Sequence, residues 1–410
     1  MKVLIFHPSG NSNVRAIAKG FLTQGLLYQF HTSIAVFPNN FWDKIAKLKG
    51  LGDIKRRSFD SGLQNYTEVY PIRELGRMIA SKFRLNALIK SETGFFCVDK
   101  IYQDLDKKIS KKLLKAKRKG LTAVYAYEDG ALETFIAARK LGLECIYDLP
   151  IAYHVLLQEL LQEEAARKPN WAFTLGGGIS DSTEKLERKR KELELADTIV
   201  VASDFVRQSL PEWATEKKII QSAFGTPFSS NQFDLEQKNN NKKLRILFVG
   251  SMTQRKGLGD LFDAMQLVDA SKVELVVLGS LAAPLSFYSN HATFIYEPTR
   301  SHDKVLELMR TCDVFCLPSI VEGRALVIQE AMSQGLPIII TANTGAEDLV
   351  ITEQTGFLVP IRSPEAIAEK INWFLDNRSK IFQMGKKAKQ LADTYSWDGY
   401  ANKICTVLNS

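Results

Sequence analysis

Short apolar segments of strand length alternate with amphipathic helical segments along almost the whole chain. In the first half, strands are predicted at residues 2–7, 32–37, 122–127, 144–149 and 198–202, with a helix over residues 13–28. In the second half, strands at residues 245–250, 273–279, 292–296, 314–318 and 337–341 are separated by helices over residues 258–268, 303–309 and 325–334. This alternation favours α/β domains in which helices cover both faces of a doubly wound parallel sheet.

The length of 410 residues predicts about two such domains. Residues 229–243 form a polar, Asn-rich stretch without apolar periodicity. This stretch is the predicted linker between a first domain at residues 1–228 and a second domain at residues 244–394. Ligands of open parallel sheets bind outside the carboxyl ends of the strands. We therefore expect the functional site in the cleft between the two domains.

Composition excludes several other classes of protein. Hydrophobic residues make up 45% of the chain and charged residues 24%, which is typical of a globular protein. No apolar run approaches the roughly 20 residues of a membrane-spanning helix, and residues 1–8 indicate a first strand rather than a signal peptide. The five cysteines are scattered, and Cys312 and Cys316 lack a second pair or a nearby His. We expect a cytoplasmic protein without disulfides or a metal site.

Positive charge is concentrated in the first half of the chain. Its densest piece runs from Lys107 to Lys119, where eight Lys and Arg residues accompany apolar residues at helical spacing. A second piece around Trp42 mixes aromatic and basic residues. Either piece is a solvated helix face or a contact for an anionic membrane or a charged acceptor. Nucleic acid is disfavoured, because no aromatic stacking platform or binding motif accompanies the charge.

A first chemical motif follows the strand at residues 245–250. Gly250 closes the strand, Ser251 begins a turn of small residues, and Arg255 and Lys256 precede a helix that Gly257 opens. Free amides and the positive end of a helix attract an anion, and Arg adds bidentate hydrogen bonds. The motif predicts a diphosphate site, although a charged surface turn has a similar sequence.

A second and stronger motif follows the strand at residues 314–318. Glu322 lies in the next loop, and a helix is predicted to begin near Arg324 and Ala325, so the amides of residues 323–326 are expected to point into the cleft. Gly323 permits close approach of the backbone. Glu330 lies eight residues after Glu322 inside an apolar helical run. Both carboxylates can accept hydrogen bonds from sugar or ribose hydroxyls. The alternative for Glu322 is an acid that interacts with the dipole of the following helix, and the alternative for Glu330 is an exposed helical Glu without a binding role.

The segment from Glu322 to Glu330 resembles the E-x7-E motif of the retaining family 4 (group 1) glycosyltransferases, which have the GT-B fold. Residues 335–339, 343–349 and 355–360 also resemble blocks of this family, so the similarity covers residues 245–376. The resemblance implies two Rossmann-like domains that face a central cleft. It also implies that residues 395–410, which include Trp397, form a helix that crosses back onto the first domain.

The resemblance further implies transfer of a sugar from a nucleotide-sugar donor with retained configuration and without a metal. Arg255 and Lys256 match the pair that holds the donor diphosphate, Glu322 the residue that positions the transferred sugar, and Glu330 the one that binds the ribose. The predicted donor site also includes Gly250, Ser251, Gly323, Ala325 and Leu326. Arg324 departs from the family, which usually has an aromatic residue there, and adds a cation near the phosphates or the acceptor.

The first half matches the family in fewer places. Gly10 and Asn11 follow the first strand where the family has a flexible Gly-rich loop, although a plain strand-to-helix turn capped by Asn fits as well. His154 resembles a cleft His that contacts the donor, and a lone His is otherwise often structural. Glu128 and Asp129 end a strand at the cleft, where they can bind acceptor hydroxyls, act as a base or cap a helix.

The resemblance to this family implies a hexosyltransferase-type enzyme that acts on a saccharide or lipid-linked acceptor in polysaccharide or glycolipid biosynthesis. The basic first domain predicts peripheral association with the inner face of the membrane. Two alternatives stay open. One is an epimerase that hydrolyses a nucleotide sugar, and the other is a non-catalytic subunit or sensor that binds one.

Overall fold

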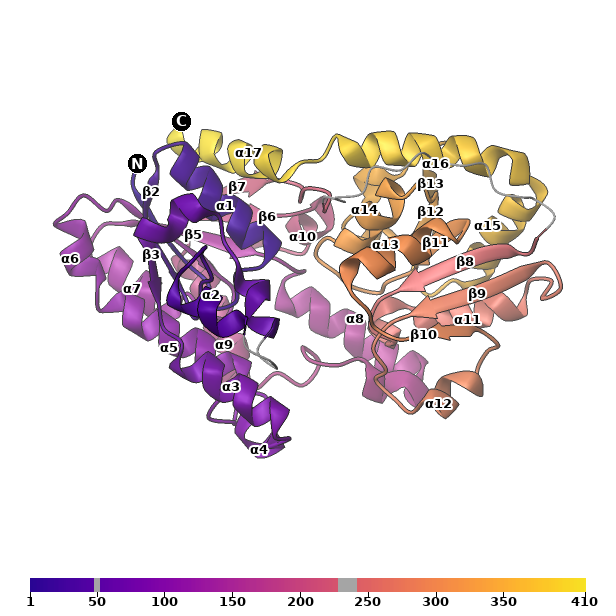
Figure 1. The fold of residues 1–410 in the computed structure, drawn as a ribbon, viewed down its shortest axis with the longest axis horizontal. Coiled ribbons are helices and arrows are strands. Elements are labelled where there is room, and N and C mark those ends of the chain that lie inside the picture. The colour runs from indigo at the N-terminus through magenta and orange to yellow at the C-terminus, as the bar shows by residue number, and fades with distance from the viewer. Residues whose placement is uncertain (48–51, 228–241) are drawn as a thin grey trace.

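Two parallel β-sheets, each flanked by helices, form the two halves of the molecule (Figure 1). The structure is a computed structural model that describes residues 1–47, 52–227 and 242–410. The predicted linker at residues 229–243 lies outside the described residues except for its last two positions.

The first sheet is seven-stranded, and its strands follow the order β3-β2-β1-β4-β5-β6-β7. All of its neighbouring strands are parallel. The strands are β1 (Val3–Phe6), β2 (Leu27–Thr32), β3 (Thr67–Val69), β4 (Ala123–Tyr127), β5 (Glu144–Leu149), β6 (Thr198–Val201) and β7 (Lys218–Gln221). The parallel order brings the carboxyl ends of β1, β4 and β5 side by side at one edge.

The second strand differs from the sequence-based prediction. Helix α1 (Ser12–Thr23) ends before residue 28, and the strand begins at Leu27 rather than at residue 32. Gly25 is the cause, because it adopts a left-handed conformation with φ of 67° and donates its N–H to the Leu22 carbonyl. This is a common way to end a helix, and the chain then turns directly into β2.

Both faces of the first sheet are covered. Val3 and Ile5 face one apolar core with α1, and Leu4 and Phe6 face another with α5 and α7. Alternation of two buried faces explains the continuous apolar sequence of β1. The other elements of this half are α2 (Phe41–Ala46), η1 (Gly52–Arg57), η2 (Ser61–Tyr66), α3 (Ile72–Lys82), α4 (Asn86–Ile89), α5 (Val98–Ser110), α6 (Leu113–Lys117), α7 (Leu132–Lys140), α8 (His154–Arg167), η3 (Pro169–Thr174), α9 (Thr183–Leu195), α10 (Asp204–Gln208) and η4 (Glu212–Ala214).

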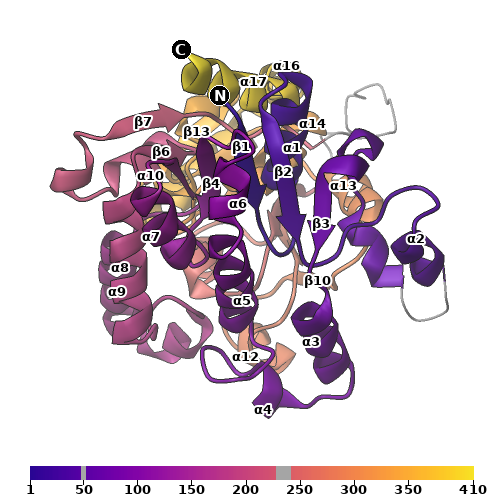
Figure 2. The same ribbon diagram turned by 90° about the vertical axis from the view of Figure 1, so that its left-hand side faces the viewer.

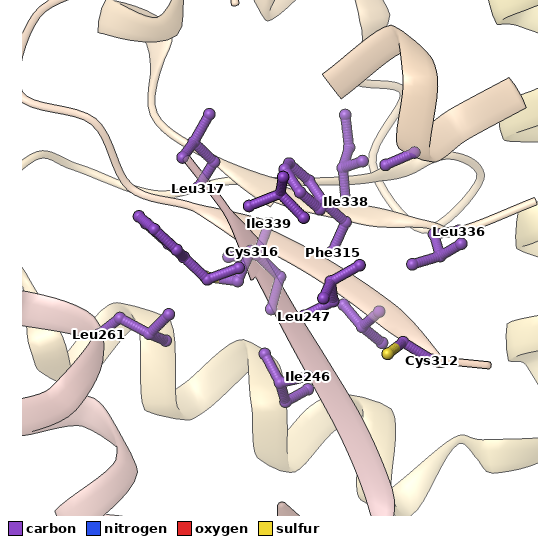
Figure 3. Close-up of a cluster of buried hydrophobic side chains, with 14 of the residues drawn as sticks. Ile246, Leu247, Leu261, Cys312, Phe315, Cys316, Leu317, Leu336, Ile338 and Ile339 are labelled. Atoms are coloured by element: carbon purple, nitrogen blue, oxygen red, sulfur yellow. The ribbon is translucent and has the colours of Figure 1, made fainter. Parts of the chain in front are cut away.

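The second sheet is six-stranded and also parallel, in the order β10-β9-β8-β11-β12-β13. Its strands are β8 (Leu244–Val249), β9 (Val273–Leu278), β10 (Ile295–Glu297), β11 (Val314–Leu317), β12 (Ile338–Ile340) and β13 (Gly356–Leu358). Side chains of its central strands gather in one apolar core (Figure 3). This half also contains η5 (Gln254–Lys256), α11 (Leu258–Gln266), α12 (Leu285–Ser289), α13 (His302–Arg310), α14 (Leu326–Ser333), η6 (Ala342–Thr344), η7 (Glu347–Leu349), α15 (Pro364–Asp376), α16 (Arg378–Asp393) and α17 (Trp397–Asn409).

Two segments lie against the half of the molecule to which they do not belong in sequence. Helix α17 follows the second sheet but lies along α1, where Tyr400, Ile404 and Leu408 join the core of the first sheet (Figure 1). In the opposite direction, Trp171 of η3 is buried in the core of the second sheet beside Phe262. Each half of the molecule therefore contributes side chains to the apolar core of the other half.

The sequence predicted one continuous basic helix between Lys107 and Lys119, and this prediction is wrong. The segment comprises the last turn of α5 and the short helix α6, because the chain turns at residues 111–112 so that Leu113 is buried. Three of its cations have partners within the protein: Lys108 pairs with Asp104, Lys112 pairs with Glu68, and Lys117 donates to the Leu141 carbonyl. Within the described ranges, no helix is long and apolar enough to cross a membrane.

Candidate functional site

The turn after β8 presents two cations at the edge of the second sheet. Gly250 and Ser251 follow the strand, and Arg255 and Lys256 occupy the single turn η5. Gly257 then connects η5 to α11 with φ of 72°, and a Cβ atom there would lie 2.0 Å from the Pro318 carbonyl oxygen. Only Gly fits this position, which fixes the cations beside the end of β11.

The two cations converge on Glu322. The Glu322 carboxylate accepts from Arg255 Nη1 at 2.9 Å and lies 2.7 Å from Lys256 Nζ. Its loop is held in place because the Ile320 N–H donates to the Arg255 carbonyl and the Glu322 N–H donates to Asn343. The structure thus brings together the three residues predicted to handle the diphosphate and the sugar.

The backbone of the first domain packs directly against Gly323. A Cβ atom at Gly323 would lie 1.7 Å from the Pro150 carbonyl oxygen, and Ser203 Oγ donates to the Gly323 carbonyl at 2.6 Å. The expectation that the amides of residues 323–326 all point into the cleft is wrong at Ala325, whose N–H donates to Thr344. The loop therefore forms a direct contact between the two domains.

Arg324 is directed into the protein interior. Its guanidinium is buried, forms a bidentate pair with Asp348 at 2.8 and 3.1 Å, and lies over the Tyr395 ring. It also donates to the Gly345 carbonyl. The Arg324 side chain thus connects the Glu322 loop to Asp348 and to Tyr395, which follows α16. The sequence predicted that this cation lies near the phosphates or the acceptor, but it pairs with Asp348 inside the second domain.

Glu330 lies in the second turn of α14 and is largely buried. Burial raises the pKa of its carboxyl group, and the nearby His302, whose Nδ1 lies 3.6 Å from Glu330 Oε1, acts in the opposite direction. Leu326, at the start of the same helix, lines the large cavity of the first domain. Helix α14 therefore carries a largely buried carboxylate, Glu330, beside His302, and its first residue, Leu326, reaches the first domain.

A buried polar network fixes the cationic turn to the first domain. Gln254, directly before Arg255, donates to Glu164 at 2.7 Å and to Asp260 at 2.9 Å, and it accepts from the Gly259 N–H. Arg167 of α8 bridges the same two carboxylates at 2.6 Å. Glu164, Asp260 and Gln254 are fully buried, so a buried polar network joins the cationic turn to α8.

His154 begins α8, and its two ring nitrogens are buried without hydrogen-bond partners among the described residues. Burial lowers its pKa to about 4, with a smaller contribution from Lys189. The ring is therefore neutral at physiological pH and keeps one donor and one acceptor for a ligand. An unpaired buried His is costly, which favours a binding role over a structural one.

A cavity of about 1420 Å³ opens in the first domain and extends to Leu326. Gly10 and Asn11 line it, on a loop that is held by His7, whose Nδ1 accepts from the Ser9 and Gly10 amides. Burial lowers the pKa of His7 to about 3, so the ring is neutral. The loop predicted to resemble a flexible Gly-rich segment is thus held by a strand-end His.

Glu128 and Asp129 line the same cavity. Glu128 and Asp129 do not cap α7. The backbone amides of residues 131–134 at the start of that helix donate to Glu192 and Asp106 instead. Each acid keeps one buried oxygen without a partner, and Lys189 lies 3.6 Å from Glu128 and 3.8 Å from Asp129. Burial raises the pKa of Glu128 to about 7, which suits a group that exchanges a proton near neutral pH.

Sequence reasoning missed His7, Lys189 and Gln254. His7 carries a local signal, since it ends a strand before a Pro-Ser-Gly turn. Lys189 and Gln254 carry none, because the partners that join them to other elements, Glu128 and Glu164, are distant in the sequence. Among the described residues, no group of three or more His, Cys, Asp or Glu side chains is arranged to hold a metal ion.

Comparison with known proteins identifies the second domain. Residues 230–391 match the family model of the glycosyl transferases group 1. The capsular polysaccharide biosynthesis glycosyltransferase CapM of Staphylococcus aureus is 30% identical over 220 residues, which cover 48% of this chain and 56% of CapM. The chain spans about half the length of the curated relatives it matches first.

Solved structures show the same overall architecture. Sucrose-phosphate synthase from Thermosynechococcus elongatus superposes with a TM-score of 0.65 at 16% identity, covering 100% of this chain and 98% of that one. Anabaena Alr3699/HepE in complex with UDP and glucose gives a TM-score of 0.57 at 16% identity, with full coverage of both chains. Together with the two parallel sheets, these likenesses show the GT-B fold.

Proposed function

Since residues 230–391 belong to the glycosyl transferases group 1 family, we propose that this protein transfers a sugar from a nucleotide-sugar donor to an acceptor hydroxyl. The observation that carries the proposal is the convergence of Arg255 and Lys256 on Glu322 at 2.9 and 2.7 Å. Arg255 and Lys256 provide two positive charges that can neutralise a sugar diphosphate, and Glu322 provides a carboxylate beside them that can contact the sugar. The diphosphate oxygens replace Glu322 as partner of the cations, and the carboxylate then contacts the sugar.

The two cations stabilise the departing diphosphate. Negative charge develops on the phosphate oxygen as the bond to the sugar C1 breaks, and two fixed positive charges lower the energy of that state. This pair supplies the charge that a divalent metal would otherwise supply, so we propose metal-independent transfer. Glu330, on the facing helix, binds the ribose hydroxyls of the nucleotide.

We propose that the configuration at C1 is retained. The acceptor oxygen bonds to C1 on the face that the diphosphate leaves, and the acceptor proton passes to a phosphate oxygen. We further propose that His154, which is neutral and unpaired at the start of α8, donates to the sugar or to the phosphate.

The acceptor occupies the cavity of the first domain, where Glu128, Asp129, Gly10 and Asn11 offer polar contacts. A volume of about 1420 Å³ accommodates more than one sugar unit or a lipid-linked saccharide. CapM acts in capsular polysaccharide biosynthesis, so we propose the same setting, polysaccharide or glycolipid assembly, for this protein. We also propose a cytoplasmic location, which is supported by the five cysteines being buried free thiols.

The test measures donor binding and nucleotide release with a panel of nucleotide sugars in the presence of a chelator. We expect the wild-type protein to bind one donor and to release its nucleotide only when an acceptor is added. Glu330→Ala should weaken donor binding by about tenfold or more, because it removes a charged hydrogen-bond acceptor. Glu322→Gln should keep donor binding but slow nucleotide release by about a hundredfold or more.

Glu369→Ala is the matched control, since Glu369 is an exposed helical residue of the same domain. Donor binding without release in any acceptor mixture would instead indicate a non-catalytic nucleotide-sugar-binding subunit. Release without any acceptor would indicate a hydrolysing enzyme. No donor bound by the wild-type protein would refute the proposal.

A further inference from the structure

Helices α3 and α4 and the loop into α5 extend downward from the body of the first domain in both views (Figures 1 and 2). Among the described residues, this projection carries several large apolar side chains that are exposed. The exposed fraction is 74% for Ile72 and 68% for Phe83. We call the following set the apolar projection: Ile72, Ile79, Phe83, Leu85, Phe95 and Val98.

The charge on the projection is positive. Lys82, Arg84 and Lys90 are exposed among the apolar side chains. The acids between residues 72 and 98 are Glu74 and Glu92, and both are engaged with the protein itself. Glu74 is buried and pairs with Arg57 and Arg77, and Glu92 accepts from the Ser182 N–H. The outer surface thus combines apolar groups with cations and presents little negative charge.

We propose that the apolar projection docks onto an anionic lipid bilayer. Exposed Phe, Leu and Ile side chains on one surface enter the boundary between headgroups and acyl chains, and surrounding Lys and Arg contact anionic headgroups. A large exposed apolar surface on an otherwise globular protein marks an interaction site. Charge complementarity favours an anionic membrane over a neutral one.

The projection continues into the cavity of the first domain. Ile79 and Val98 belong to the apolar projection and also line the cavity, together with Lys82 and the exposed Phe41. The cavity therefore opens where the protein meets the bilayer. A lipid-linked molecule can enter it from the membrane while its polar end reaches Glu128 and Asp129.

The basic segment between Lys107 and Lys119 is the competing surface, and its apolar content is lower. Leu113 and Ala116 are buried, which leaves Leu114 as its large exposed apolar residue. That segment can attract anionic lipid but offers little to insert. The two surfaces therefore predict different responses to substitution.

The test is flotation of the full chain with vesicles of phosphatidylcholine alone or with phosphatidylglycerol. We expect the wild-type protein to float with the anionic vesicles. Phe83→Ser/Leu85→Ser should lower the partition coefficient by about tenfold or more, because it removes two inserted side chains. Arg84→Gln/Lys90→Gln should lower binding to anionic vesicles by about fivefold for each cation.

The matched control is Leu114→Ser/Lys115→Gln in the competing segment, which should float like the wild-type protein. Binding alone is measured, so the result does not depend on transferase activity. The proposal is overturned if the wild-type protein stays with the unbound fraction or if both projection variants float unchanged. It is also overturned if the projection variants abolish a dimer seen by light scattering while vesicle binding is absent, since the surface would then join two protein copies.

Discussion

Replacing Gln254 by Leu tests whether the domain interface holds the cationic turn. The substitution keeps the size of a fully buried side chain but removes its polar atoms. It deletes hydrogen bonds to two carboxylates, Glu164 and Asp260, and leaves the Gly259 N–H without its acceptor. Water cannot replace these partners, because the site is closed to solvent.

The magnitude follows from these three hydrogen bonds. A hydrogen bond to a charged group is worth about 1.5–3 kcal/mol, and an unsatisfied buried amide costs about 1–3 kcal/mol. Arg167 and Arg362 still neutralise Glu164, so the lower ends of these ranges apply. We therefore expect a loss of about 4 kcal/mol in the free energy of unfolding, a large part of the roughly 5–15 kcal/mol of a typical protein.

Urea unfolding followed by tryptophan fluorescence measures this loss, because Trp171 lies in the second core close to Gly259. Calorimetric titration with the donor nucleotide measures the second effect, a drop of about tenfold in affinity as Arg255 and Lys256 lose their fixed position. Gln266→Leu is the matched control, since Gln266 is exposed and donates to the His291 carbonyl rather than to a buried carboxylate. If Gln254→Leu changes stability and affinity no more than Gln266→Leu does, the network does not support the turn.

Two further substitutions probe burial and close packing. Burial raises the pKa of Asp148 to about 7 from an ordinary value of 3.8, so between these pH values the folded protein holds a proton that the unfolded chain has lost. Stability should therefore fall as pH rises from about 4 to about 7, by at most about 4 kcal/mol for this group, and Asp148→Asn should flatten the curve in that window; parallel curves for variant and wild type in pH-dependent urea unfolding would contradict this. Gly323→Ala should lower the melting temperature and donor turnover, because its Cβ would lie 1.7 Å from the Pro150 carbonyl oxygen, whereas Gly177→Ala, with no atom within 4 Å of the new Cβ, should leave both unchanged; equal behaviour of the two variants would show that the domains do not need this contact.

The sequence was most informative where structure depends on local pattern. Strand β5 (Glu144–Leu149) has the predicted limits, β8 is shifted by one residue from the prediction, and β9 ends one residue earlier than predicted. The agreement is close because buried parallel strands have continuous apolar sequences. The second strand was misplaced because the left-handed Gly25 was read as part of a helix. Glycine ends a helix only in some contexts, and sequence alone does not show which.

The candidate site was predictable as far as its motifs are local. Arg255, Lys256 and Glu322 come together because each follows the end of a neighbouring parallel strand, which is a consequence of topology. The side chain of Arg324 was misjudged, since its partner Asp348 lies 24 residues away and no pattern joins them. The network around Gln254 was beyond reach for the same reason, because it depends on how two domains meet.

The return of α17 to the first domain has a consequence for the order of folding during synthesis. Its side chains Tyr400, Ile404 and Leu408 belong to the core of the first sheet, yet the ribosome makes them after the whole second sheet. At usual rates of synthesis, roughly 10 to 40 seconds separate β7 from α17. During that interval the surface of α1 that α17 will cover is exposed. The first domain is therefore the first to be synthesised and the last to complete its core. Its incomplete form exposes an apolar surface that a chaperone can bind.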